Sequence, residues 1–197
     1  DEMPFLKYEL FNWDDPKLSS YYTNGEQRLN NFNFHILTMS RGCYGHCAFC
    51  CITDVWKKYS YKSPARIAAE IDYMIKQYGK PSQWFKFVDE TFPVKSSRLI
   101  DMCKAVEKLG IRWEAYLRGD IIDNEVMGLL GRSGLFNIPV GMESGSQKIL
   151  DGLDKGITVE GLYDTFQYAH YNNINTYASL IVGSVGETDE TIEETKN

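Results

Sequence analysis

The sequence has no long apolar run, no surplus of basic residues and no low-complexity tract. A membrane-spanning helix needs about 18 consecutive apolar residues, and no run among the 197 residues approaches that length. The chain also lacks a basic segment followed by an apolar one at its start, the pattern of a secretory signal. With 43% hydrophobic and 24% charged residues, these absences predict a globular cytoplasmic protein with no membrane partner.

The charge balance is acidic. Lys and Arg total 21 against 27 for Asp and Glu, which gives a net charge of −6. A chain of this balance offers no broad basic face to a phosphate backbone, so we do not expect nucleic acid among its partners.

Cysteines are few, and four of the five fall within nine residues: Cys43, Cys47, Cys50, Cys51 and Cys103. An odd count in a chain of this length favours ligands over a disulfide framework. We expect Cys103 to be a buried core residue on a helix. Cys51 is expected to pack behind the cysteine loop, because adjacent side chains diverge and cannot readily share one ion with Cys50.

A zinc-binding structural module is one interpretation of these cysteines. A closed tetrahedral zinc site uses four ligands, often as two CxxC pairs, and the sequence has no second pair. His35 or His46 would have to supply the fourth ligand. The residue pattern alone does not exclude this zinc-binding alternative.

Apolar strand-like segments alternate with helical ones from Phe32 onward. The predicted strands are 32–38, 84–88, 111–116, 136–141 and 176–182, and the predicted helices are 64–78, 97–109, 124–131, 158–171 and a last helix near the end of the chain. Ser63 and Asp123 stand where N-caps belong, and Gly79 ends the first helix. The repeated strand–helix order predicts an α/β fold with a parallel sheet. Residues 1–31 show no lasting period and are predicted to be a lead-in segment.

Polar residues follow four of the five predicted strands. They are the cysteines, Asp89 with Glu90, Arg118, and Glu143 with Ser144. Because the carboxyl ends of parallel strands open on one face, a single site is expected to collect these side chains.

Cys43, Cys47 and Cys50 form a CxxxCxxC pattern on one loop, with the aromatic Phe49 directly before the third cysteine. A [4Fe–4S] cluster held by three cysteines leaves one iron free to bind a substrate or cofactor. The pattern resembles the signature of the radical S-adenosylmethionine (SAM) enzymes. The resemblance implies that the open iron chelates SAM and that one electron, from a donor such as flavodoxin or ferredoxin, cleaves SAM to a 5′-deoxyadenosyl radical.

The resemblance continues over about residues 32–190 and implies further cofactor contacts. It places Asp89 and Glu90 near the SAM amino group, and Arg118 near the SAM carboxylate. Glu143 and Ser144 resemble a motif near the ribose, and the segment of Gly183 resembles the one against which adenine lies. Phe49 is a further cofactor-binding candidate.

Residues 141–158 are most similar to radical SAM enzymes that carry an N-terminal cobalamin-binding domain. The resemblance implies a partial (βα)6 TIM-type barrel, of which residues 32–197 would supply five βα units and be truncated at the C-terminus. Residues 1–31 would then follow a cobalamin-binding domain. The expected chemistry is hydrogen abstraction or cobalamin-dependent methyl transfer on an unknown small molecule or peptide, with a methylthiotransferase-like enzyme as the alternative.

Overall fold

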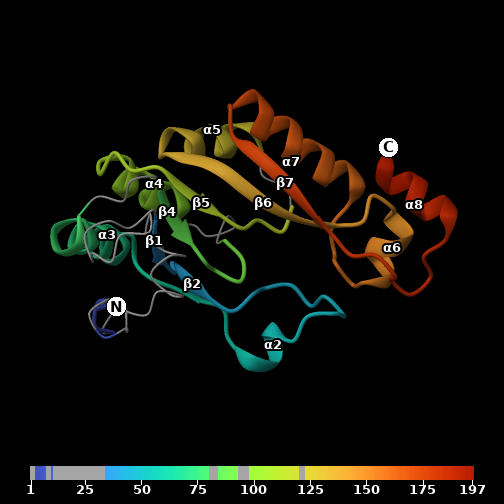
Figure 1. Cartoon of the computed structure of the whole chain (residues 1–197), viewed down its shortest axis with the longest axis horizontal. Helices are drawn as coiled ribbons and strands as arrows, with labels where there is room; N and C mark the ends of the chain where they lie inside the picture. The colour runs from blue at the N-terminus through green and yellow to red at the C-terminus, as the bar shows by residue number, and fades with distance from the viewer. Residues whose placement is uncertain (1–2, 8–9, 11–33, 80–83, 93–97, 120–122) are drawn as a thin grey trace, which may run out of the picture.

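A computed structural model describes residues 3–7, 10, 34–79, 84–92, 98–119 and 123–197. Its centre is a five-stranded parallel sheet with the strand order β1-β4-β5-β6-β7 (Figure 1). These strands are β1 Phe34–Leu37, β4 Trp84–Phe87, β5 Trp113–Ala115, β6 Leu135–Glu143 and β7 Asn175–Leu180. Each predicted strand falls on one of them, which confirms the α/β fold and the parallel sheet.

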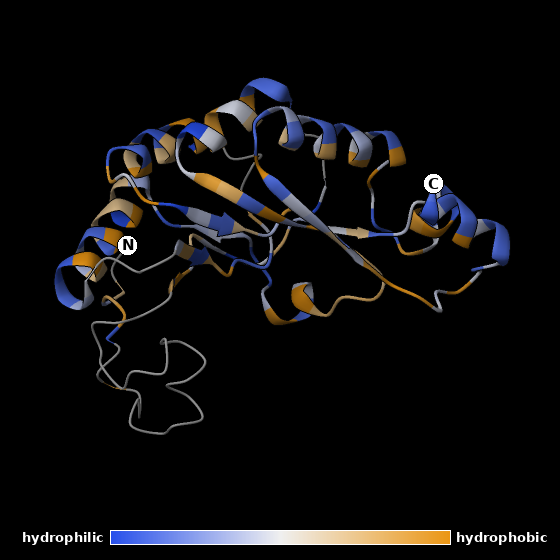
Figure 2. Ribbon diagram, turned by 45° about the horizontal axis from the view of Figure 1, so that its top comes forward, coloured by the Kyte–Doolittle hydropathy of each residue, from blue (hydrophilic) through white to orange (hydrophobic). Residues whose placement is uncertain are grey.

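Four longer helices lie along one face of this sheet (Figure 1). They are α3 Pro64–Tyr78, α4 Leu99–Glu107, α5 Asn124–Arg132 and α7 Val159–Tyr171. The predicted caps form, because the side chains of Ser63 and Asp123 accept hydrogen bonds from the backbone N–H groups of Arg66 and Val126. Hydrophobic and hydrophilic residues alternate along the helices, as Figure 2 shows, and this pattern gives each helix one apolar side for the sheet.

The strand order equals the chain order, and the helices between strands stay on one face. A doubly wound fold would reverse its strand order and cover both faces, so this arrangement is a sector of a βα barrel. With α8, Asp189–Lys196, after β7, the described residues contain five βα units, as predicted. Within the described residues the sheet is not closed, and β1 and β7 are its two edges.

The hydrophobic core lies between the sheet and the helices. Trp113 is at its centre, with its ring 5.4 Å from that of Phe87 and 5.3 Å from that of Phe92, and its indole N–H donates to the carbonyl of Ser133. Cys103 is fully buried in this core, as predicted. His35 is also buried and bonds through Nε2 to the carbonyl of Gly79 at 2.8 Å, so it is a structural residue.

Several short elements were not predicted. They are β2 Ser40–Arg41, β3 Ser60–Tyr61, α2 Ile52–Val55 and α6 Gln147–Gly152. β2 and β3 pair antiparallel and hold together the two ends of residues 42–59, the cysteine loop. In the part of the chain that the structure describes, no helix combines the length and apolar character that crossing a membrane requires. Most of the predicted lead-in segment, residues 1–31, lies outside the described residues.

Candidate cluster and cofactor site

A cavity of about 380 Å³ opens at the carboxyl ends of the strands. Its walls come from the cysteine loop, from the ends of β4, β5, β6 and β7, and from the segment between α6 and α7: Cys43, Cys47, Phe49, Cys50, Ile52, Glu90, Tyr116, Leu117, Arg118, Gly141, Glu143, Lys155 and Ser179. Seven of the ten predicted site residues are in this set. The volume lies within the range of about 300–1,000 Å³ that small-molecule sites have.

The three cysteines of the CxxxCxxC pattern are free thiols on the cavity wall. Cys43 and Cys47 are half-buried and Cys50 is exposed. Among the described residues, no three His, Cys, Asp or Glu side chains converge as a single metal ion would require. In a [4Fe–4S] cluster with three cysteine ligands, each of three irons takes one cysteine and the fourth iron stays open. Three free thiols on one cavity wall are a donor set that such a cluster can use.

Cys51 differs from its prediction. It is exposed and stands at the N-cap of α2, a single turn that has no buried residue. α2 projects from the rest of the molecule on the cysteine loop (Figure 1), and Cys51 is exposed at its start.

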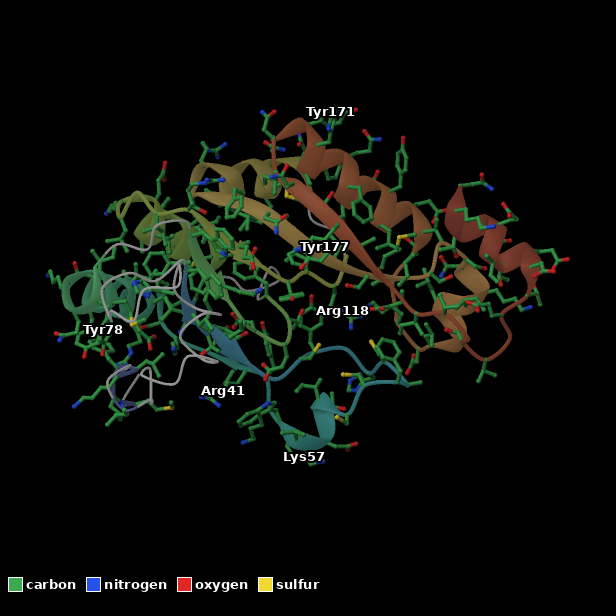
Figure 3. All side chains as sticks on the ribbon, viewed as in Figure 1. Arg41, Lys57, Tyr78, Arg118, Tyr171 and Tyr177 are labelled. Carbon is green, nitrogen blue, oxygen red and sulfur yellow. The ribbon has the colours of Figure 1, made fainter. Side chains whose placement is uncertain are left out.

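Arg118 joins the sheet to the cysteine loop, and Figure 3 shows it between the two. Its Nη1 donates to the Sγ of Cys47 at 3.2 Å, and its Nη2 donates to the carbonyl of Lys155. A Cβ atom at Gly45 would overlap Nη1 of Arg118, so the loop approaches the guanidinium only with glycine at this position. The prediction did not include Gly45, whose only signal was its place between the first two cysteines.

Glu143 and Lys155 form a buried ion pair in the cavity wall. Their side chains are 10% and 5% exposed, and Lys155 Nζ lies 2.8 Å from Glu143 Oε1. Glu143 adopts φ 66° where the pairing of β6 with β7 shifts register, a strained conformation for a residue other than glycine. Lys155 was not predicted as a site residue. The signal for it was that a charged residue ending an apolar strand needs a partner.

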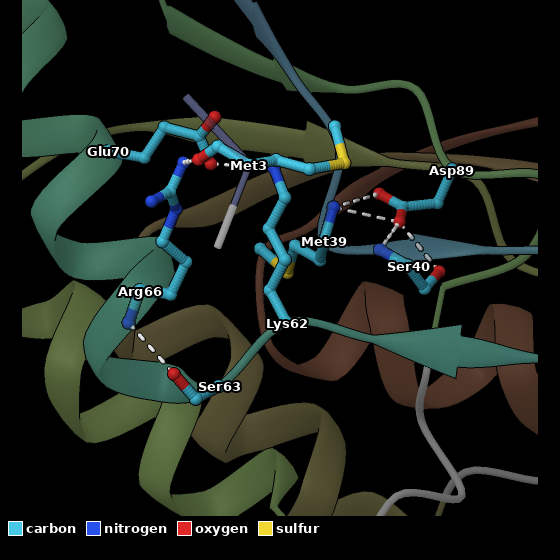
Figure 4. A network of polar contacts seen from close by, with 8 residues as sticks. All are labelled: Met3, Met39, Ser40, Lys62, Ser63, Arg66, Glu70 and Asp89. Carbon is cyan, nitrogen blue, oxygen red and sulfur yellow. Dashed lines mark hydrogen bonds and ion pairs between the residues drawn. The ribbon is translucent and has the colours of Figure 1, made fainter. Parts of the chain in front are cut away.

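The adjacent carboxylates Asp89 and Glu90 point to different places. Glu90 lines the cavity, and its Oε2 accepts a hydrogen bond from the Gly42 N–H at 3.1 Å. Asp89 is buried outside the cavity wall and accepts hydrogen bonds from the Met39 N–H at 2.9 Å, the Ser40 N–H and the Ser40 hydroxyl at 2.6 Å (Figure 4). Burial raises the pKa of Asp89 to about 6 against the effect of these bonds.

Ser144 and Gly183 also lie outside the cavity wall. The Ser144 hydroxyl is 3.1 Å from the Thr195 hydroxyl of α8 and accepts from the Ser146 N–H. Gly183 is exposed, and its N–H donates to Glu187 Oε2 at 2.7 Å. The structure therefore brings together Cys43, Cys47, Cys50 and four partners, but not Asp89, Ser144 or Gly183. The four partners are Phe49, Glu90, Arg118 and Glu143.

Comparison with known families decides what this arrangement is. The model of the radical SAM superfamily matches residues 37–197. The chain belongs to the radical SAM superfamily. Radical SAM enzymes bind a [4Fe–4S] cluster and SAM, and the matched residues include the three cysteines and the whole cavity wall.

The radical SAM relatives include methyltransferases and a cyclase. Over 164 residues the chain is 32% identical to the anaerobic magnesium-protoporphyrin IX monomethyl ester cyclase of Rubrivivax gelatinosus, which covers 81% of this chain and 29% of the cyclase. The fold is similar to the radical SAM methyltransferase TsrM from Kitasatospora setae, with TM-score 0.74, 18% identity and coverage of 83% and 33%. It is similar to the cobalamin-dependent SAM radical enzyme OxsB, with TM-score 0.72, 21% identity and coverage of 81% and 25%. The chain thus spans about a third or less of the length of these three proteins.

Proposed function

We propose that this chain is the catalytic core in which Cys43, Cys47 and Cys50 hold a [4Fe–4S] cluster and the adjoining cavity holds SAM. The bound cofactors supply reductive cleavage of SAM to a 5′-deoxyadenosyl radical, for hydrogen abstraction or for cobalamin-dependent methyl transfer. One observation carries the proposal: the three cysteine thiols line the same cavity as the charged groups Glu90, Arg118 and Glu143.

The charges of the cavity wall suit a zwitterionic cofactor. Arg118 and Lys155 contribute positive charges, and Glu90 and Glu143 contribute negative ones. The methionine part of SAM carries an ammonium, a carboxylate and a sulfonium, so Glu90 is the candidate for its ammonium and Arg118 for its carboxylate. Phe49 has a half-exposed ring on the wall that suits an apolar part of the cofactor. The predicted contacts of Asp89, Ser144 and Gly183 would require rearrangement.

Arg118 has a second expected role toward the cluster. Its guanidinium donates to the Sγ of Cys47, and charge near a ligating sulfur tunes the reduction potential of an iron–sulfur centre. We expect the Arg118 guanidinium to stabilise the reduced, more negative state of the cluster.

Anaerobic reconstitution with iron and sulfide tests the proposal. We expect a brown protein with about four irons that releases 5′-deoxyadenosine from SAM when a reductant is added. The triple variant Cys43→Ala, Cys47→Ala, Cys50→Ala should lose both the iron and the product. Cys51→Ala is the matched control, because it removes the adjacent exposed thiol and should keep both. A triple variant that retains iron and activity would refute the proposal, and one zinc in a colourless wild type would favour the zinc module.

Cobalamin use is a separate question for the full-length protein. The likeness to OxsB and to the methyltransferase TsrM favours cobalamin-dependent methyl transfer among the possible reactions. Equilibrium dialysis of the full-length protein with cobalamin tests this, and failure to bind would favour hydrogen abstraction without cobalamin.

A further inference from the structure

A basic surface borders the cysteine loop of this acidic chain. Arg41, Lys57 and Lys58 are all exposed and flank the cysteines on both sides in the sequence. Figure 3 shows Arg41 and Lys57 beside α2, on the side of the molecule away from α7. Residues 40–58 contain one acid, Asp54, which lies 3.5 Å from Lys57 in a pair that is almost fully exposed. Such a pair is weak, so the surface keeps its positive character.

The fold brings the chain at Arg41 close to the chain at Lys57 and Lys58. Gly42 has φ 86°, and a Cβ atom there would lie 2.9 Å from the Lys58 carbonyl oxygen and 3.3 Å from Trp56 Cβ. Only glycine permits this close approach of the two ends of the cysteine loop. The Arg41 guanidinium lies 5.1 Å from the centre of the Trp56 ring, and Arg41 pairs with Ser60 between β2 and β3. The basic surface is therefore tied to the base of the loop that carries Cys43.

An exposed apolar residue and an exposed ligand adjoin the basic surface. Val55 of α2 is 61% exposed, and Cys50 is exposed just before α2 begins. An apolar contact with charges around it is the usual composition of a protein interface, and complementary charge raises the rate of encounter. Electron transfer requires the donor to come close to the cluster, and this surface is where the ligand loop reaches solvent.

We propose that the basic surface of Arg41, Lys57 and Lys58 docks an acidic one-electron carrier protein that reduces the cluster. The proposal rests on the proposed function. In each turnover the carrier loses one electron and the cluster gains it. That electron then cleaves one C–S bond of SAM, which yields methionine and the 5′-deoxyadenosyl radical.

The test uses the full-length, reconstituted protein and two double variants with the same change in net charge. Lys57→Glu with Lys58→Glu reverses the basic surface. Lys104→Glu with Lys108→Glu is the control, because these two lysines are exposed at the end of α4. Formation of 5′-deoxyadenosine is measured with two reductants, dithionite and a reduced acidic flavodoxin, and the iron content of each protein is recorded.

With flavodoxin at low salt, the Lys57/Lys58 variant should be slower than wild type on the order of 10-fold, because steering by charge is lost. With dithionite its rate should stay within about twofold of wild type, and the Lys104/Lys108 variant should keep both rates. The difference should shrink at about 0.5 M salt, where surface charges are screened.

Two results would overturn the docking proposal while leaving the proposed function intact. One is an unchanged flavodoxin-driven rate in the Lys57/Lys58 variant, and the other is an equal loss in the Lys104/Lys108 control. Weaker binding of labelled RNA by the Lys57/Lys58 variant, with its flavodoxin-driven rate unchanged, would reassign the surface to nucleic acid. A wild type that forms no product with dithionite would instead refute the proposed function, and the docking proposal would then be refuted as well.

Discussion

The two faces of the sheet differ in composition. The residues that face the helices are buried and almost all apolar: His35, Leu37, Phe85, Phe87, Trp113, Ala115, Ile138 and Val140. The opposite, inner face carries polar side chains in matching register: Lys86, Glu114, Tyr116, Asn137 and Tyr177. In a closed βα barrel the inner positions are filled by branched apolar residues. Here the inner face mixes these polar side chains with the apolar side chains of Phe34, Ile36 and Trp84.

Glu114 contacts two of the polar side chains of the inner face, Lys86 and Asn137. Its Oε1 lies 3.0 Å from Lys86 Nζ, and its Oε2 accepts a hydrogen bond from Asn137 at 3.1 Å. Along the strands this face runs directly into the cavity, since Tyr116 follows Glu114 by two residues and lines the cavity wall. Burial, and then the hydrogen bond with Tyr116, raises the pKa of Tyr177 to about 12, so its hydroxyl stays neutral. The outer face therefore forms the core, while the inner face carries polar side chains that continue toward the cavity.

The largest expected loss of stability comes from truncating a buried residue of the outer face. Trp113→Ala should lower the free energy of unfolding by about 3–5 kcal/mol, because a fully buried indole leaves a cavity. Tyr177→Phe on the inner face is the control and should change it by less than about 1 kcal/mol, since the side chain is half exposed. Urea unfolding at pH 7 measures both. Similar losses in the two variants would mean that both faces are core.

Breaking the ion pair between Glu143 and Lys155 in the cavity wall should cause the next largest loss of stability. Lys155→Met removes the counter-charge of Glu143 and should lower the free energy of unfolding by about 3 kcal/mol, because a buried carboxylate is left unpaired. The double variant Glu143→Gln, Lys155→Met should recover most of that loss in the same urea experiment. If the double variant loses the sum of the two single losses, the two side chains are not coupled.

The sequence predicted the longer helices and the strands of the main sheet better than the short elements, for a physical reason. Helices and strands of the outer layer depend on local periodicity and caps, such as Ser63 and Asp123, and these signals are complete within a few residues. The elements α2, α6, β2 and β3 are too short to show a period. The positions of β2, α2 and β3 depend on how the cysteine loop folds back on itself.

At the candidate site, the sequence identified which residues to consider but not the directions in which their side chains point. The cysteines, Glu90, Arg118 and Glu143 were predicted because each follows a strand. Lys155 was missed because its contact with Glu143 spans 12 residues and exists only after the chain folds. Ser144 was predicted to face the cofactor, whereas the structure directs its hydroxyl to Thr195 of α8.

Asp89 is buried and the adjacent Glu90 is exposed, so the two carboxyl groups differ in environment. The pH dependence of stability can therefore distinguish them. The pKa of Asp89 is raised to about 6 in the folded chain by burial, above the usual 3.8. The folded state therefore binds this proton more tightly than the unfolded state, so this contribution to stability is present below pH 3.8 and is lost as the pH rises through 6. Between pH 4 and 7.5 the loss should be about 2 kcal/mol.

Asp89→Asn should remove this contribution, so that its free energy of unfolding falls by about 2 kcal/mol less than that of wild type between pH 4 and pH 7.5. Glu90→Gln is the matched control, because it changes the adjacent, exposed carboxylate and leaves Asp89 in place. Urea unfolding at the two pH values measures the difference for each protein. The same pH dependence in Asp89→Asn and wild type would contradict the assignment, since the buried carboxylate of Asp89 could not then be the group that titrates.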